Sequence, residues 1–276
     1  MNAAAGLSTM LFVPGSKPER FARALACDAD VVCVDLEDSV PEAGKAEARA
    51  ASIAAIAEGD ARLVLRINGM TTRAGLEDLI ALADAPRLPA LLFVPKVESP
   101  AEIGIIRSVL GARCPGIVPL IETVKGLTAG HAIAAEPGVV AMMFGGGDFA
   151  AELGVALAWE PLAYARGAFI QACAGASIPA IDVPYIILDD AAGLETETRA
   201  AKALGFSAKA AIHPSQVDVI NSVLRPTPAE IAEAEAAEKA FAAAGGAAVR
   251  FNGRMLEAPI MRRYQRILAM RSNNDA

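Results

Sequence analysis

The chain has 276 residues, 54% of them hydrophobic, which is enough for a sizeable core in one large domain or two small ones. Its formal net charge is −7, so it lacks the clustered Lys and Arg surplus that marks a nucleic-acid-binding domain. Since no apolar run approaches the roughly 20 residues that span a bilayer, we expect neither a nucleic-acid nor a membrane partner.

The cysteines and the N-terminus bear on the cellular compartment. The four cysteines (Cys27, Cys33, Cys114 and Cys173) show no CxxC pairing, and three of them lie in or beside apolar runs, where small buried thiols are common. Residues 1–10 have no basic segment of the kind that opens a secretory signal. These features predict a reducing, cytoplasmic setting.

Short apolar runs recur along the chain and alternate with alanine-rich segments of helical spacing. Most runs are continuous, which is typical of strands buried on both faces of a parallel sheet. They begin roughly 20–40 residues apart, near the length of a strand–helix–strand unit. Eight such units predict an α/β fold, a (β/α)8 TIM barrel over residues 1–225, with a doubly wound open sheet as the alternative. The runs are Met10–Val13, Val31–Val34, Leu63–Ile67, Leu91–Val94, Ile117–Ile121, Val139–Phe144, Ile178–Val183 and Ser207–Ile212.

Polar side chains follow nearly every run, at the point where the strand would end. In a barrel of this type, the carboxyl ends of the strands form the face that holds the active site. A barrel used only as a scaffold would need no such concentration, so the pattern predicts an enzyme. The main residues of this set are Lys17, Asp35, Glu37, Asp38, Arg66, Asn68, Lys96, Glu98, Glu122, Thr123, Asp148, Asp182 and His213.

Two carboxylates stand out in the stretch 116–148. One apolar run ends in Glu122, and the next ends in the glycine-rich turn Gly145–Gly147 followed by Asp148. The unit therefore places an acid at the exit of each of two neighbouring strands. Such a pair suits Mg²⁺, which takes one or two carboxylates and leaves its other positions to water and substrate.

The segment after residue 225 is additional to eight strand–helix units. Thr227 and Glu230 form a capping box that opens an alanine- and glutamate-rich helix. The dipeptide Asn252-Gly253 between two short apolar strands predicts a hairpin with a type I′ turn. A last helix is expected over Ile260–Arg271. We interpret residues 226–276 as a helical and hairpin lid over an active site, in the same subunit or a neighbour.

Seven motifs occur in an order and at spacings that resemble one protein family. They are LFVPGS, VDLEDSV, RING, PKVES, PLIET, the glycine-rich turn with Asp148, and AIHPSQ. Together they are similar to the citrate lyase β-subunit-like branch of the HpcH/HpaI aldolase superfamily, which includes malyl-, citramalyl- and citryl-CoA lyases. The resemblance implies a (β/α)8 barrel, usually trimeric, with one Mg²⁺ in each site. Its members cleave a 3-hydroxyacyl thioester into a 2-oxoacid and an acyl thioester, or catalyse the reverse reaction.

The resemblance also implies roles for individual residues. Glu122 and Asp148 match the family's metal ligands. Glu122 is also expected to contact the substrate, and Arg66 matches a substrate-contacting arginine. Glu37 and Asp38 match acids that lie behind the metal-bound waters. In many lyases an aspartate near the C-terminus reaches a neighbouring subunit's site. Here the matching residue is Glu257, an acid one methylene longer, which we expect to act as catalytic acid or base.

Several of these residues also have simpler interpretations. Glu122 could cap a surface helix, and Asp148 could be a helix N-cap. Arg66 could pair with Glu37 or Asp38, and Glu257 could be an exposed acid without a catalytic role. Lys17 and Lys96 could meet CoA phosphates or form local ion pairs. His213 favours a structural hydrogen bond, because it precedes a proline at a strand end.

The expected function is that of a Mg²⁺-dependent carbon–carbon lyase, of the oxo-acid-lyase type, acting on a short 3-hydroxyacyl-CoA. The expected partners are a CoA thioester, a 2-oxoacid and further copies of the chain in a homo-oligomer. Two alternatives stay open. One is a malyl-CoA thioesterase, and the other is the β subunit of a citrate lyase complex that acts on a carrier-protein thioester.

Overall fold

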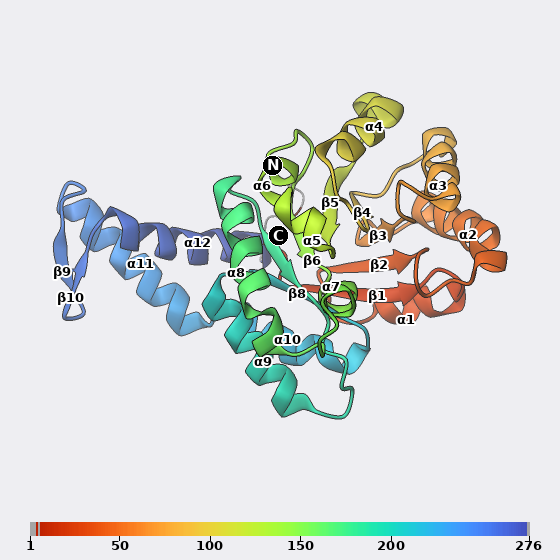
Figure 1. Cartoon of the computed structure of the whole chain (residues 1–276). Helices are drawn as coiled ribbons and strands as arrows, with labels where there is room; N and C mark the ends of the chain where they lie inside the picture. The colour runs from red at the N-terminus through yellow and green to blue at the C-terminus, as the bar shows by residue number, and fades with distance from the viewer. Residues whose placement is uncertain (1–3, 5, 275–276) are drawn as a thin grey trace.

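The computed structural model describes residues 4 and 6–274, with side chains to residue 270; residues 1–3 and 5 of the N-terminal segment and 275–276 of the predicted lid lie outside the described part. Eight parallel strands close into a barrel in the order β1 to β8 (Figure 1). This confirms the (β/α)8 prediction over the open sheet. The strands are β1 (Thr9–Pro14), β2 (Val31–Asp35), β3 (Leu63–Arg66), β4 (Leu91–Val94), β5 (Gly116–Ile121), β6 (Met142–Phe144), β7 (Ala180–Asp182) and β8 (Ala208–Ala211).

The strands are continuous apolar runs because both of their faces are buried. In β2, Val31 and Cys33 belong to the cluster inside the barrel, whereas Val32 and Val34 pack under the surrounding helices. This is the period of two expected for a strand. Every residue of β2 is buried, so no polar face is left to interrupt the run.

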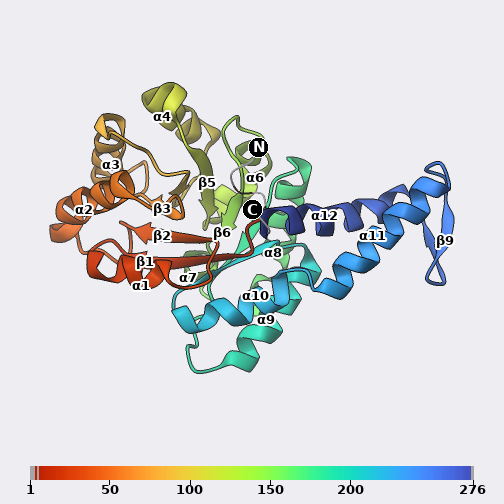
Figure 2. The same ribbon diagram turned by 180° about the vertical axis from the view of Figure 1, so that it is seen from behind.

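Helices lie between successive strands and cover the outside of the barrel (Figures 1 and 2). Within the described residues, no helix has both the length and the apolar character required to cross a membrane. The α-helices that surround the barrel are α1 (Phe21–Leu25), α2 (Lys45–Glu58), α3 (Arg73–Asp84), α4 (Pro100–Leu110), α5 (Val124–Thr128), α6 (Gly130–Ala134), α7 (Gly146–Leu153), α8 (Trp159–Gly175), α9 (Ala191–Leu204) and α10 (Val217–Leu224).

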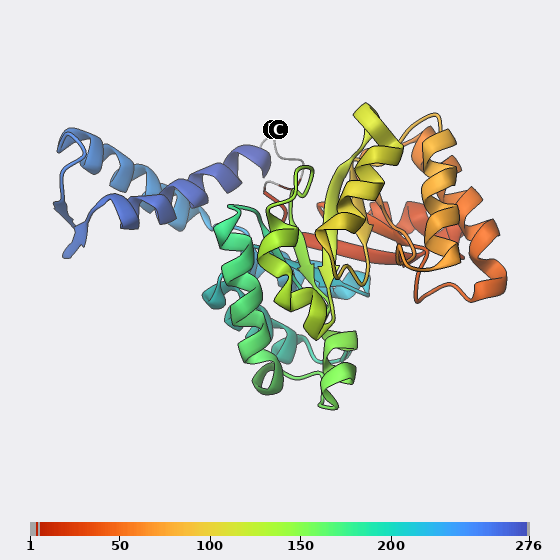
Figure 3. The same ribbon diagram turned by 45° about the horizontal axis from the view of Figure 1, so that its top comes forward.

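The C-terminal segment forms a separate arm with a small core of its own, which joins Ala237, Leu256 and Met261. The arm consists of α11 (Pro228–Ala243), the strands β9 (Val249–Phe251) and β10 (Arg254–Leu256), and α12 (Ala258–Asn274). Figures 1 and 3 show α11 and α12 side by side, projecting away from the barrel. The last helix begins two residues earlier than expected, with Pro259 in its first turn, where a missing N–H is tolerated.

The chain turns sharply between β9 and β10, at the predicted dipeptide. Asn252 and Gly253 have φ values of 46° and 76°, as a type I′ turn requires, and Thr227 and Glu230 form the predicted capping box of α11. Local sequence signals are therefore sufficient for the elements of the arm.

One polar residue that we expected at the barrel mouth lies elsewhere. Asp182 alternates with Ile181, which points into the barrel, so its carboxylate turns outward beneath the helices. There it contacts Arg166 of α8 (3.1 Å) and Lys209 of β8 (2.7 Å). Lys209 also binds Glu197 (2.8 Å) and the carbonyl of Val183 (2.7 Å). The expectation that Asp182 belongs to the mouth was wrong.

Lys209 is fully buried, and its removal should destabilise the fold. Lys209→Met would leave the partly buried Glu197 without this cation and the buried Asp182 with Arg166 alone, and breaking a buried ion pair typically costs about 3–5 kcal/mol. Urea unfolding followed by circular dichroism would measure the loss. Lys125→Met is the matched control, because Lys125 forms an exposed ion pair with Glu98 and should change stability by less than about 1 kcal/mol. Equal stabilities of the two variants would contradict the prediction.

Candidate active site

A cavity of about 460 Å³ opens at the carboxyl ends of the strands. Side chains from five strands (β1, β2, β3, β5 and β6), and from the segments that follow β2, β5, β6, β7 and β8, surround it, so the barrel brings together residues that are far apart in the sequence. The charged residues among them are Asp35, Asp38, Arg66, Glu122 and Asp148, and the others are mostly apolar, including Phe12, Leu120, Met143, Leu157, Val183, Ile186 and Ile212.

Arg66, the last residue of β3, is held by the acids that follow β2. Its Nε and Nη2 atoms bind the two carboxylate oxygens of Asp35 at 2.6 and 2.8 Å. Nη1 lies 3.0 Å from Glu37, and Nη2 lies 3.5 Å from Asp38. The expected pairing with Glu37 or Asp38 therefore exists, but Asp35 is the principal partner, which sequence reasoning missed.

The Asp35 pairing affects both the ionisation and the reach of Arg66. Burial acts to lower the pKa of Arg66, but the hydrogen bonds and charge of Asp35 outweigh it, so the pKa is raised. Burial likewise opposes the charge of Asp35, whose pKa is nevertheless lowered by Arg66. Because Asp35 occupies the Nε–Nη2 edge, a substrate oxygen would meet the outer, terminal nitrogens of Arg66.

Glu122, like Asp35, is a deeply placed acid of the cavity, with 4% of its surface exposed against 3% for Asp35. It does not cap a helix, because Thr123 is the N-cap of α5. Instead its Oε1 accepts a hydrogen bond from the backbone N–H of Lys96 at 2.7 Å. Burial, together with the charges of Glu37 and Asp148, raises the pKa of Glu122 to about 8. The ionised form is thus disfavoured unless a cation approaches.

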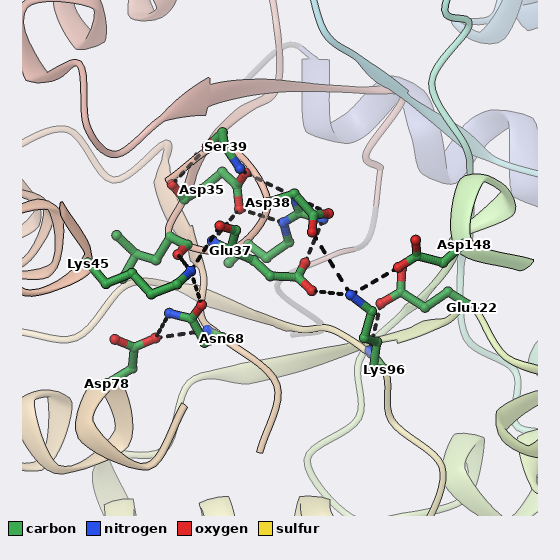
Figure 4. A network of polar contacts seen from close by, with 12 residues as sticks. Asp35, Glu37, Asp38, Ser39, Lys45, Asn68, Asp78, Lys96, Glu122 and Asp148 are labelled. Atoms are coloured by element: carbon green, nitrogen blue, oxygen red, sulfur yellow. Dashed lines mark hydrogen bonds and ion pairs between the residues drawn. The ribbon is translucent and has the colours of Figure 1, made fainter. Parts of the chain in front are cut away.

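Gly145 brings the turn after β6 into contact with Glu122. A Cβ atom at this position would lie 2.4 Å from the Glu122 Cβ and 2.6 Å from its Oε2, so only glycine fits. Gly145 is the N-cap of α7, and Asp148 is the third residue of that helix. Asp148 is therefore not the N-cap, and Figure 4 shows its carboxylate beside that of Glu122.

Lys96 forms the local ion pairs that were one of its two predicted alternatives. Its Nζ lies 2.8 Å from Glu37 Oε1 and 3.0 Å from Asp148 Oδ2, between the loops that follow β2 and β6 (Figure 4). Lys96 also has φ = 53°, a left-handed conformation that is uncommon for residues other than glycine. The sequence did not choose between the two alternatives, and it gave no signal for the left-handed conformation.

A second lysine supports the loop that carries Glu37. Lys45 Nζ donates to the carbonyl oxygens of Leu36 and Glu37, at 3.0 Å each, and to Asn68 Oδ1 at 2.6 Å. Asn68 in turn donates to Asp78 of α3 (Figure 4). These bonds fix the backbone of the loop, so Glu37 and Asp38 are placed by the fold rather than by a ligand.

The unsatisfied oxygens of the site suit a hard cation. Glu37 Oε2 and Asp148 Oδ2 are buried and form no directed hydrogen bond, and their only contacts in the described residues are the ion pairs with Arg66 and Lys96. In that same part of the chain, no three His, Cys, Asp or Glu side chains converge as a complete protein-only metal site. Two adjacent carboxylates with open positions fit an ion that keeps waters and substrate oxygens, as Mg²⁺ does.

Three of the residues with a predicted or possible site role lie apart from both the cavity lining and the ion pairs of Arg66 and Lys96. Glu257 is exposed on the C-terminal arm and does not line the cavity of its own subunit. Lys17 is exposed after β1 and is also absent from the lining. His213 is exposed, and its ring caps the turn Pro214–Gln216 by accepting from the Ser215 N–H at 3.2 Å, which is the structural role we expected.

The sequence matches the family model described as HpcH/HpaI aldolase/citrate lyase over residues 8–214. Among curated proteins, the human mitochondrial citramalyl-CoA lyase is 30% identical, over 95% of this chain and 84% of that one. An L-malyl-CoA/beta-methylmalyl-CoA lyase of Cereibacter sphaeroides is 33% identical, over 90% and 89%. A (3S)-malyl-CoA thioesterase of that species is 32% identical, over 81% and 79%.

A solved structure agrees with these sequence matches. CitE from Mycobacterium tuberculosis, in complex with magnesium, acetoacetate and coenzyme A, superposes with a TM-score of 0.81 and 33% identity, over 98% of this chain and 99% of that one. The matched region extends through every strand of the barrel and the loops that carry Arg66, Glu122 and Asp148. The chain therefore belongs to the HpcH/HpaI aldolase/citrate lyase family.

Proposed function

We propose that the protein is a Mg²⁺-dependent carbon–carbon lyase that cleaves or forms a short 3-hydroxyacyl-CoA, with a 2-oxoacid and an acyl-CoA as the other partners. The observation that carries this proposal is the convergence of Glu122, Asp148 and Arg66 on one cavity. It provides two adjacent acids for a divalent cation and one fixed guanidinium for a carboxylate. The activities named for its relatives fit the same chemistry.

Glu122 and Asp148 would hold the cation, and Glu37 and Asp38 would accept hydrogen bonds from its waters. When bound, Mg²⁺ supplies Lewis-acid polarisation of the oxygens of the 2-oxoacid. The high pKa of Glu122 favours this arrangement, since an adjacent cation removes the cost of ionising a buried carboxyl. The acids are already in position, because Lys96, Lys45 and Arg66 hold them.

In the cleavage direction, the C3 hydroxyl gives up its proton and the C2–C3 bond breaks. The electron pair of that bond passes to the acyl-CoA fragment as an enolate, which then takes up a proton on carbon. Arg66 would orient the carboxylate at the reacting end through its terminal nitrogens, while Asp35 keeps the guanidinium in place. The cavity's apolar wall excludes water from the enolate, which would otherwise be protonated without control.

We infer that Glu257 supplies the proton to the enolate from a neighbouring subunit of a homo-oligomer, the trimer that is usual in this family. Two features support this inference. The arm projects away from its own barrel, with Glu257 and Met255 exposed on it. The cavity rim also exposes the apolar side chains of Ile186, Ile187 and Ile212, which a second subunit could cover. The four free cysteines fit the expected cytoplasmic location.

The alternative activity is hydrolysis of malyl-CoA at the thioester, which the relationship to a thioesterase favours. The same two acids and cation could activate water instead of stabilising an enolate. A role as the β subunit of a complex that uses a carrier-protein thioester is the second alternative. It would leave the isolated chain without activity on free CoA esters.

Product analysis tests the proposed function directly. Malyl-, citramalyl- and citryl-CoA would be incubated with the protein in Mg²⁺ or in EDTA, and both 2-oxoacid and free CoA would be measured. If the protein is a lyase, glyoxylate, pyruvate or oxaloacetate should form in a Mg²⁺-dependent reaction, without release of an equal amount of free CoA. Release of CoA with an intact hydroxyacid would identify the thioesterase instead, and inactivity on all three esters would direct attention to a carrier protein.

Replacing Glu122 should stabilise the metal-free protein at alkaline pH. The pKa of Glu122 is raised from 4.5 to about 8 on folding, so the wild type loses stability as pH rises through this window, where only the unfolded carboxyl has ionised. Glu122→Gln cannot ionise and keeps the oxygen that accepts from Lys96. In EDTA, the melting temperature of Glu122→Gln minus that of the wild type should increase as the pH rises from about 5 to about 8.

The control for this prediction is Glu98→Gln. A hydrogen bond from Lys125 lowers the pKa of Glu98, so its removal should bring no gain over the same window. Added Mg²⁺ should raise the melting temperature of the wild type and of Glu98→Gln, but not that of Glu122→Gln. A constant difference between Glu122→Gln and the wild type at all pH values would contradict the assigned ionisation.

Replacing Glu257 should slow turnover by about 10²-fold or more while leaving Mg²⁺ binding unchanged, as expected for a general acid. Glu257→Gln would be compared with Glu238→Gln, a matched control on the exposed face of the same arm. Inactive Glu257→Gln and Arg66→Ala chains would also be mixed, dissociated and reassembled. Recovered activity would indicate a shared site, because only then does an intact Arg66 meet an intact Glu257. No recovery would place both residues in one subunit, and unchanged turnover of Glu257→Gln would remove it from the mechanism.

A further inference from the structure

Lys96 contacts different acids of the site through its backbone and through its side chain. Its N–H donates to Glu122 Oε1 at 2.7 Å. Its Nζ lies 2.8 Å from Glu37 Oε1, 3.0 Å from Asp148 Oδ2 and 3.9 Å from Asp38 Oδ1. Figure 4 shows the ammonium between the loop after β2 and the carboxylates of Glu122 and Asp148.

The backbone of Lys96 is strained in a way that makes these contacts possible. A φ of 53° is unfavourable for a residue with a side chain, and such strain persists where surrounding structure enforces it. The hydrogen bond to Glu122 is part of that enforcement. The left-handed turn directs the amide toward Glu122 while the side chain crosses to Asp148, so both acids are linked to one residue.

The contact with Asp148 is ionic and replaceable. Asp148 Oδ2 is buried and forms no directed hydrogen bond, and in the described part of the chain Lys96 is the cation beside it. The Lys96 side chain is 43% exposed, so it has room to swing toward solvent without disturbing the core. A flexible ammonium next to an otherwise unsatisfied oxygen can be displaced by a stronger cation.

We propose that Lys96 is an exchangeable counter-ion that competes with the divalent cation for Asp148. Without metal, the ammonium offsets the charge of Glu37 and Asp148 and keeps these acids close together. On metal binding, it withdraws from Asp148. Lys96 therefore lowers the affinity of the site for the bare ion, and tight binding requires the additional anionic oxygens of the substrate. This inference rests on the metal site of the proposed function.

The test is a calorimetric titration of the metal-free protein with MgCl₂ alone, which needs no turnover. Lys96→Met removes the ammonium and keeps much of the side-chain volume. Since an ammonium in contact with the liganding oxygens repels the ion strongly, affinity for Mg²⁺ should rise at least about tenfold. Lys96→Gly also removes the ammonium and suits the left-handed backbone, so it should bind more tightly even if Lys96→Met folds poorly.

Lys125→Met is the matched control. It changes the net charge by the same amount, but Lys125 is 73% exposed and pairs with Glu98, so solvent screens it and the dissociation constant should change less than about threefold. The melting temperature supplies a second readout, because Mg²⁺ should raise it more in Lys96→Met than in the wild type.

Unchanged or weaker Mg²⁺ binding by both Lys96 variants would overturn the inference and make Lys96 a residue that only positions the acids. The proposed function would survive that result, provided that the wild type binds Mg²⁺ and Glu122→Gln does not. Absence of Mg²⁺ binding by the wild type and by both Lys96 variants would overturn both, and an equal gain in Lys125→Met would overturn the specific competition in favour of a general charge effect.

Discussion

Negative charge at the barrel mouth is the constraint on which the rest of the structure depends. Five carboxylates meet two cations there, and several of these groups are buried, where an unpaired charge is expensive. The raised pKa of Glu122 is a direct consequence. A divalent ion supplies the charge that the protein lacks at this place. The carboxylates are those of Asp35, Glu37, Asp38, Glu122 and Asp148, and the cations are Arg66 and Lys96.

The barrel tolerates this imbalance because the stabilising interactions lie elsewhere. Two large apolar clusters, one inside the strands and one beneath the helices, hold the fold independently of the mouth. The site itself has two local constraints, the left-handed Lys96 and the close approach of Gly145 to Glu122. Acids held in place before a ligand arrives need no reorganisation when it binds, which is the arrangement that favours catalysis.

The fold could be predicted from the sequence because burial on both faces leaves continuous apolar runs. The weakest run is β8, which Lys209 interrupts. The side-chain pairings could not, because they depend on strand register. Asp35 lies opposite Arg66, and Asp182 lies opposite Lys209. The side chains of the first pair point to the cavity. Those of the second pair point outward, because the residue beside Asp182, and not Asp182 itself, faces the inside of the barrel. Each pair joins two charged residues of neighbouring strands, and the sequence alone cannot distinguish the two cases.

Lys96 was ambiguous for a different reason, since its direction depends on a single backbone dihedral that no local motif specifies. The same limit applies to Glu257, whose proposed role depends on a second copy of the chain. The arm has its own small core and capping box, so its shape is encoded locally, but it makes few contacts with the barrel of its own chain. An acid on such an arm can approach and leave a neighbouring cavity as one unit. In the proposed shared site, the extra methylene of Glu257 changes how far the proton donor reaches, and thereby which acyl group it can serve.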